Sequence, residues 1–135
     1  LDVQQAIVDR MEQNGPDFIC LNFANPDMVG HTGDMAAAIK ACETVDQCAE
    51  KVIAAALKKD YVTLVIADHG NCDIMFNEDG SPHTAHTTNR VPLALVGVEA
   101  GSASLRDGRL GDLAPTLLKL LNVDKPAAMT GESLI

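Results

Sequence analysis

The strongest constraint on the fold is the apolar run at residues 61–67 (YVTLVIA), which is rich in β-branched residues and ends directly at Asp68. A strand with one solvent-facing side alternates apolar and polar residues, and this run does not. It therefore predicts a central strand that is covered on both faces. Aromatic residues make up only 3% of the chain and Trp is absent, so the core must be aliphatic. Such a core is common where helices cover a parallel sheet, and we predict an α/β fold with a mostly parallel sheet flanked by helices.

Three segments have the apolar periodicity of helices. Apolar residues recur every four positions across residues 3–11, until an Asn-Gly-Pro sequence stops the pattern. Asp34 is a suitable N-cap for a long helix that reaches about Lys59. Asp112 is placed to cap a closing helix that runs through Leu121, where Asn122 suits the end of the helix.

Two further strands are predicted, at residues 18–23 and 91–98, and the polar segment at residues 22–33 reads as a loop. No repeat or interdomain linker divides the chain, so we expect one layered unit. Cys20, Cys42 and Cys48 form no CxxC pair. We expect them to be buried as small apolar side chains in a reducing cytosol.

All four histidines fall in three short segments that follow the ends of predicted strands or lie in the loops beyond them: His31, His69, His83 and His86. In open parallel sheets, sites form in the crevice beyond the carboxyl ends of the strands. We therefore expect these segments to converge on one pocket, although they lie far apart in the sequence.

Two of the segments pair an acid with a histidine. Asp27 and His31 lie in a glycine-containing loop, where the backbone can turn sharply and approach a ligand closely. Asp68 and His69 leave the end of the apolar run, where an ionisable pair costs desolvation unless it is used, and Gly70 supplies the turn that lets both side chains reach one cation. The alternative for each segment is a surface turn with incidental polar residues.

The third segment holds His83 and His86, three residues apart. One can be a metal ligand and the other a partner of a ligand, or either can lie on the surface, and the sequence leaves His83 undecided. Together, the two aspartates and the histidines offer oxygen and nitrogen donors without thiolate, which suits Mn²⁺, Mg²⁺, Zn²⁺ or iron. Cys72 lies close enough to be a soft ligand, but no second thiol accompanies it.

Charge and motifs exclude several other classes of protein. The formal net charge of −9 argues against a nucleic-acid partner or an anionic membrane surface. No apolar run approaches the roughly 18 residues of a membrane span, so we expect no membrane partner. The chain has no P-loop, dinucleotide-binding or α/β-hydrolase motif, and the acidic residues 73–80 lack the spacing of an EF-hand calcium loop.

The three histidine segments together resemble the metal-binding segments of the cofactor-independent (2,3-bisphosphoglycerate-independent) phosphoglycerate mutases, members of the alkaline phosphatase superfamily. The matching strings are NPDMVGHTG at residues 25–33, ADHGN at residues 67–71 and HTAHTTN at residues 83–89. DLAPTLL at residues 112–118 and the tail MTGESLI at residues 129–135 are also similar, so the resemblance covers nearly the whole chain.

The resemblance implies a site for two divalent ions. It implies that Asp27, His31 and His86 hold the first ion and that Asp68 and His69 belong to the second. Mn²⁺ is the usual metal, with Mg²⁺, Zn²⁺ or another divalent ion as alternatives. No catalytic residue is assigned in this chain, because the family's nucleophilic Ser is expected upstream.

For the complete protein, the resemblance implies that 3-phosphoglycerate and 2-phosphoglycerate are interconverted in glycolysis and gluconeogenesis through a phosphoserine intermediate. It implies a monomeric, cytoplasmic enzyme, with residues 1–135 as the C-terminal portion of its metal-binding phosphatase-like domain. Because the sequence begins at Leu1 inside a helical pattern, we expect a missing amino-terminal part and no activity of this chain alone. The alternatives are a related phosphopentomutase or phosphomonoesterase, or a non-enzymatic metal-binding fragment.

Overall fold

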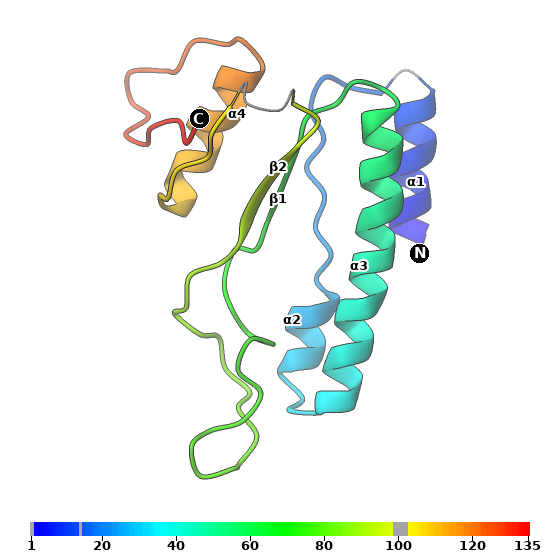
Figure 1. The fold of residues 1–135 in the computed structure, drawn as a ribbon, viewed down its shortest axis with the longest axis vertical. Helices are drawn as coiled ribbons and strands as arrows, with labels where there is room; N and C mark the ends of the chain where they lie inside the picture. The colour runs from blue at the N-terminus through cyan, green and yellow to red at the C-terminus, as the bar shows by residue number, and fades with distance from the viewer. Residues whose placement is uncertain (1, 14, 99–102) are drawn as a thin grey trace.

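A computed structural model describes residues 2–13, 15–98 and 103–135. The elements follow in the order α1 (Asp2–Glu12), α2 (Asn25–Gly30), α3 (Met35–Leu57), β1 (Thr63–Ile66), β2 (Leu93–Val96), the short 3₁₀ helix η1 (Leu110–Asp112) and α4 (Leu113–Leu120). Figure 1 shows α1 and α3 to one side of the two strands, and α4 with the C-terminus to the other. The α/β class is confirmed. Across the described residues, every helix is too short or too polar to cross a membrane.

The core lies between α1 and α3, the helices that the apolar periodicity predicts. Met11 of α1 packs against Ala55 and Ala56 of α3, and all three are buried. The long helix starts where the sequence predicts, because the Asp34 side chain accepts a hydrogen bond from the Ala37 backbone N–H at 3.0 Å. Of the residues predicted to stop the first helix, the asparagine at position 14 lies outside the described residues.

The sheet differs from the prediction in its direction. Both predicted strands β1 and β2 are present, but they pair antiparallel, with Thr63 opposite Val96 and Ile66 opposite Leu93. The prediction of a mostly parallel sheet is therefore wrong for the described residues. A parallel neighbour needs a crossover connection, usually a helix, and residues 67–92 contain no helix.

The predicted strand at residues 18–23 forms no ladder with another described segment. It runs extended between α3 and the two strands (Figure 1), and its Ile19 packs on the α1–α3 core. The prediction that β1 is covered on both faces is also wrong, because Val65 and Ile66 are 40% and 38% exposed. The described chain gives β1 a single partner strand, and the buried core forms between helices instead.

The predicted closing helix is present as α4, but Asp112 does not cap it through its side chain. The backbone of Asp112 is helical (φ −90°, ψ −8°), so the carboxylate is not aimed at the first amides of α4. It accepts instead from the backbone N–H groups of Arg109 and Glu132, at 3.0 and 2.9 Å. Asn122 ends the helix in the left-handed region (φ 54°), as its side-chain type predicts.

Candidate metal centre

The segment that the sequence marks as a loop contains the short helix α2, with Pro26 in its first turn. Asp27 lies in this helix and His31 at its C-terminal cap. Residues four apart share a helix face, so both side chains point the same way. The helix approaches the neighbouring loop closely at Gly30, where a Cβ atom would lie 2.8 Å from Cγ of Asn71. A side chain at position 30 would push the two segments apart.

The antiparallel pairing of β1 and β2 brings the other candidate residues to the same place. The chain leaves β1 at the end of the sheet where it later enters β2, because Ile66 lies opposite Leu93. The loop that follows β1 and the loop that precedes β2 therefore run side by side. A backbone hydrogen bond from Thr87 N–H to the Gly70 carbonyl, at 2.8 Å, joins them beyond the strands. His69 and His86 are the neighbours of these two residues.

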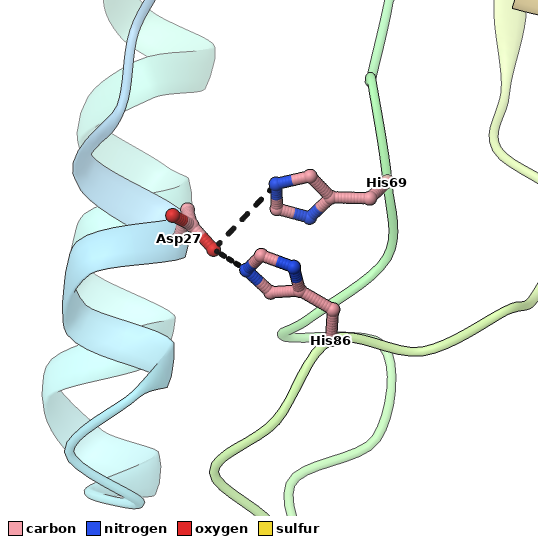
Figure 2. A group of neighbouring side chains, drawn as sticks. All are labelled: Asp27, His69 and His86. Atoms are coloured by element: carbon pink, nitrogen blue, oxygen red, sulfur yellow. Dashed lines mark hydrogen bonds and ion pairs between the residues drawn. The ribbon is translucent and has the colours of Figure 1, made fainter.

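Three imidazole nitrogens converge on one carboxylate oxygen. Oδ1 of Asp27 lies 3.0 Å from Nε2 of His86, 3.3 Å from Nε2 of His31 and 3.9 Å from Nε2 of His69. Figure 2 shows the Asp27 carboxylate reaching from α2 towards the rings of His69 and His86 on the two loops. The possible ligand atoms of these three residues all lie within 4.8 Å of one another.

Hydrogen bonds at the far side of the rings fix their orientation. Nδ1 of His31 lies 2.7 Å from the Thr84 carbonyl oxygen, which only accepts, so Nδ1 carries the proton. The Nε2 lone pair of His31 then faces Asp27 and His86, as in a metal-ligating imidazole. Nδ1 of His69 lies 3.4 Å from the Gly70 carbonyl oxygen in a longer contact of the same kind.

Asp68 lies at the rim of this group. Its side chain is 85% exposed, and its Oδ1 is 3.7 Å from Nε2 of His69. His69 thus stands between Asp68 on one side and Asp27 on the other. The rings of His69 and His86 are stacked, with centroids 3.7 Å apart and planes inclined by 20°.

Asn71 is the buried support of Asp27, and sequence reasoning assigned it no role. It is only 6% exposed, and its Nδ2 donates to Oδ1 and to the backbone oxygen of Asp27, at 2.8 and 3.3 Å. This hydrogen bond is the largest cause that lowers the pKa of Asp27, and the nearby His31, His86 and His69 lower it further. The one available signal was the position of Asn71, two residues after His69 in the same motif.

The structure separates His83 and Cys72 from the converging group. Nδ1 of His83 is buried and has no hydrogen-bond partner among the described residues. The Cys72 thiol donates to the Pro26 carbonyl at 3.0 Å, and burial raises its pKa, which disfavours the thiolate. The prediction that three cysteines lie in the core is confirmed for Cys48, which is buried, and wrong for Cys20 and Cys42, which are exposed. Cys20 lies in the extended segment outside the helices.

The chemistry of the donors fits a divalent cation. A carboxylate oxygen and neutral imidazole nitrogens are ligands that Mn²⁺, Zn²⁺ and related ions accept, and no thiolate joins them. The atoms come from three segments that are held by helix α2, by strand β1 and by the backbone bridge between the two loops. Lone pairs gathered in this way are stabilised by a positive charge placed among them.

Comparisons with known proteins agree with this chemistry. The chain matches the metalloenzyme superfamily over residues 1–125. It is 59% identical over 134 residues to a 2,3-bisphosphoglycerate-independent phosphoglycerate mutase of Flavobacterium johnsoniae, which covers 99% of this chain and 26% of the relative. A relative of the same name from Ruegeria pomeroyi is 62% identical over 122 residues, which covers 90% of this chain and 24% of the relative.

A solved structure shares the fold. The crystal structure of Leishmania mexicana phosphoglycerate mutase at low cobalt concentration aligns with a TM-score of 0.86 and 29% identity, over 98% of this chain and 27% of that one. The chain thus spans 24% to 27% of the length of these relatives. On the match over residues 1–125, the chain belongs to the metalloenzyme superfamily, and within it the chain is similar to the 2,3-bisphosphoglycerate-independent phosphoglycerate mutases.

Proposed function

We propose that this chain is the C-terminal, metal-binding portion of the phosphatase-like domain of a 2,3-bisphosphoglycerate-independent phosphoglycerate mutase. The complete protein would interconvert 3-phosphoglycerate and 2-phosphoglycerate. The observation that carries the proposal is the convergence of Asp27, His31, His69 and His86 on one point, in a chain that is 59% identical to a mutase of that name.

The proposed ligands divide between two ions. Asp27, His31 and His86 would hold the first, and the mutual distances of 3.0 to 3.3 Å between their ligand atoms support this grouping. Asp68 and His69 would belong to the second ion, on the side where Asp68 is exposed. His69 lies within reach of both groups, which supports two ions placed close together.

We propose Mn²⁺ for both positions, with Mg²⁺, Zn²⁺ or another divalent ion as substitutes. Bound divalent ions supply positive charge that stabilises a phosphoryl group during its transfer. The chain's own part is to present the ligand atoms in fixed directions. His31 is held by the Thr84 carbonyl, and Asp27 is held by Asn71.

The nucleophilic serine and the groups that grip the substrate would come from the remainder of the mutase. Arg90 is the basic residue nearest to the motifs in the sequence, and its exposed guanidinium is paired with Asp107 at 2.5 Å. We therefore propose that transfer proceeds through a phosphoserine formed outside this chain.

We further propose a monomeric enzyme that acts in the cytoplasm as part of glycolysis and gluconeogenesis. The free state of all four cysteines supports a reducing compartment. The absence of nucleic-acid or membrane partners remains an expectation from the net charge of −9.

A chimera tests the proposed activity. This chain would replace the matching 134 residues of the Flavobacterium johnsoniae relative, and the product would be assayed for interconversion of the two phosphoglycerates without added 2,3-bisphosphoglycerate. We expect activity with Mn²⁺, and a loss of activity in the same chimera carrying His86→Ala. A folded chimera that only hydrolyses phosphomonoesters, or that has no activity, would contradict the proposal.

A further inference from the structure

A hydrogen-bonded clamp joins the two histidine loops, and the metal chemistry proposed above does not account for it. The Asp73 carboxylate accepts from Oγ1 of Thr87, at 2.8 Å to Oδ2 and 3.1 Å to Oδ1. Its Oδ2 also accepts from Nδ2 of Asn89 at 2.7 Å. Asp73 follows His69 by four residues, whereas Thr87 is the next residue after His86.

The clamp surrounds the backbone bridge between the loops. Thr87 N–H donates to the Gly70 carbonyl, while the Thr87 side chain bonds to Asp73. A Cβ atom at Gly70 would lie 2.7 Å from Oδ1 and 2.9 Å from Oδ2 of Asp73. The close approach of the carboxylate thus requires glycine at position 70, so Gly70 and Asp73 are both needed for this contact.

We propose that Asp73 is a positioning residue whose carboxylate clamps the loop of His86 onto the loop of His69. Without it, the direct links between the loops beside these rings would be the backbone hydrogen bond from Thr87 to Gly70 and the ring stack, and the next backbone hydrogen bond between the loops joins His83 to Met75 further along. With it, both the backbone and the side chain of Thr87 are tied to the His69 loop. The inference rests on the metal centre proposed above, because the clamp matters through the ligand beside it.

Electrostatics agree with an ionised clamp. The pKa of Asp73 is lowered, first by the hydrogen bond from Asn89 and next by that from Thr87. Hydrogen bonds to an ionised carboxylate are stronger than those between neutral groups, so an exposed side chain such as Asp73 can still hold two partners. Thr87 is half-buried, and its hydroxyl gains a fixed acceptor.

Thr87→Val and Asp73→Asn each remove part of the clamp, and Thr87→Val does so without changing the net charge. Outer-shell partners of metal ligands typically contribute about 10- to 100-fold in metal affinity, and we expect roughly 3- to 10-fold here because Asp73 acts through a neighbour of the ligand. Mn²⁺ affinity would be measured by calorimetry. The d–d absorption of bound Co²⁺ would report the ligand geometry, and amide exchange of Thr87 in the metal-free chain would report the loop contact.

Two control variants separate the clamp from general effects. Thr87→Ser keeps the hydroxyl, and we expect it to keep wild-type affinity, Co²⁺ spectrum and exchange rate. Asp79→Asn removes the same charge from a carboxylate with equivalent hydrogen bonds, to N–H and Oγ of Ser81 at 2.9 and 2.6 Å, but these bonds stay within the turn at residues 77–81, and we expect no change.

The possible outcomes distinguish this inference from the function on which it rests. Weaker Mn²⁺ binding, an altered Co²⁺ spectrum and faster exchange of the backbone amide at position 87 in Thr87→Val and Asp73→Asn would support the clamp. Wild-type values of affinity and spectrum in Thr87→Val would overturn it. If the wild-type chain bound no metal, the proposed function would fail, and unchanged amide exchange in Thr87→Val would then overturn the clamp separately.

Discussion

Replacing Asn71 with Leu should weaken metal binding although Asn71 offers no ligand itself. Leu has the same branched skeleton as Asn but cannot donate, so Asp27 loses the 2.8 Å hydrogen bond to its Oδ1 and the 3.3 Å bond to its backbone oxygen. Oδ1 is the atom on which the three imidazoles converge. The substitution therefore leaves the ligand set intact while releasing the ligand from its support.

The size of the effect follows from the exposure of the two partners. Loss of an outer-shell hydrogen bond typically costs about 10- to 100-fold in metal affinity. Asn71 is 6% exposed, but the side chain of Asp27 is 35% exposed, so water can replace part of the lost bond. We expect the lower part of the range, about 10-fold, in the dissociation constant of Mn²⁺ measured by isothermal titration calorimetry.

A second substitution and a control make this test specific. Gly30→Ala should have a similar effect, because its Cβ would displace the Asn71 amide. Asn77→Leu removes a side-chain amide whose hydrogen bonds within the described structure go to Ser81 and the Pro82 carbonyl, and it should bind Mn²⁺ as the wild type does. If folded Asn71→Leu and Gly30→Ala both bound Mn²⁺ with wild-type affinity, the support of Asp27 by Asn71 would be refuted.

Three further predictions concern stability, each read as the urea midpoint of the chain. Asp34→Ala removes the acceptor of the Ala37 N–H at the start of α3 and should cost about 1 kcal/mol; an unchanged midpoint would contradict the cap. Thr116→Val removes a fully buried hydroxyl that donates to the Asp112 carbonyl and accepts from the Leu134 N–H. Both partners are left unpaired, so the substitution should cost about 1–3 kcal/mol, whereas Thr116→Ser should cost less. The pKa of Asp112 is lowered from 3.8 by backbone hydrogen bonds from Arg109 and Glu132, so its ionised form stabilises the fold at neutral pH and this contribution is lost as the pH falls below about 4. The difference in urea midpoint between wild type and Asp112→Asn should therefore become smaller from pH 7 to pH 3. A difference that stays constant over this range would contradict the stabilising role of ionised Asp112.

Features set by neighbouring residues could be predicted from the sequence. The periodicity of α3 and the acceptor at Asp34 act within one or two turns, so both the helix and its start follow from local chemistry. The same holds for Asn122, whose side-chain type tolerates the left-handed backbone at the end of α4.

The direction of the sheet could not be predicted in this way. An apolar run such as residues 61–67 identifies a strand but not the direction of its partner, which depends on the connection between them. The strand predicted at residues 18–23 has the right composition, yet a strand also needs a neighbour to pair with, and the described chain offers none.

The sequence predicted the residues that converge at the site better than the residues that hold them in place. The motifs correctly indicated that segments around Asp27, His69 and His86 converge, because histidines and acids cluster in loops beyond apolar runs. The roles of Asn71 and Asp73 depend on contacts with residues 44 and 14 to 16 positions away. A single sequence carries no signal for such pairs beyond the presence of amide and acid side chains near the motif.

The central claim is that Asp27, His31 and His86 bind a divalent ion, and the most direct test is a crystal of this chain grown with Mn²⁺. An anomalous difference map would locate the manganese without reference to activity. We predict a peak within coordination distance of Asp27 Oδ1 and of Nε2 of His31 and His86. A map with no peak among these three atoms, at saturating Mn²⁺, would contradict the account.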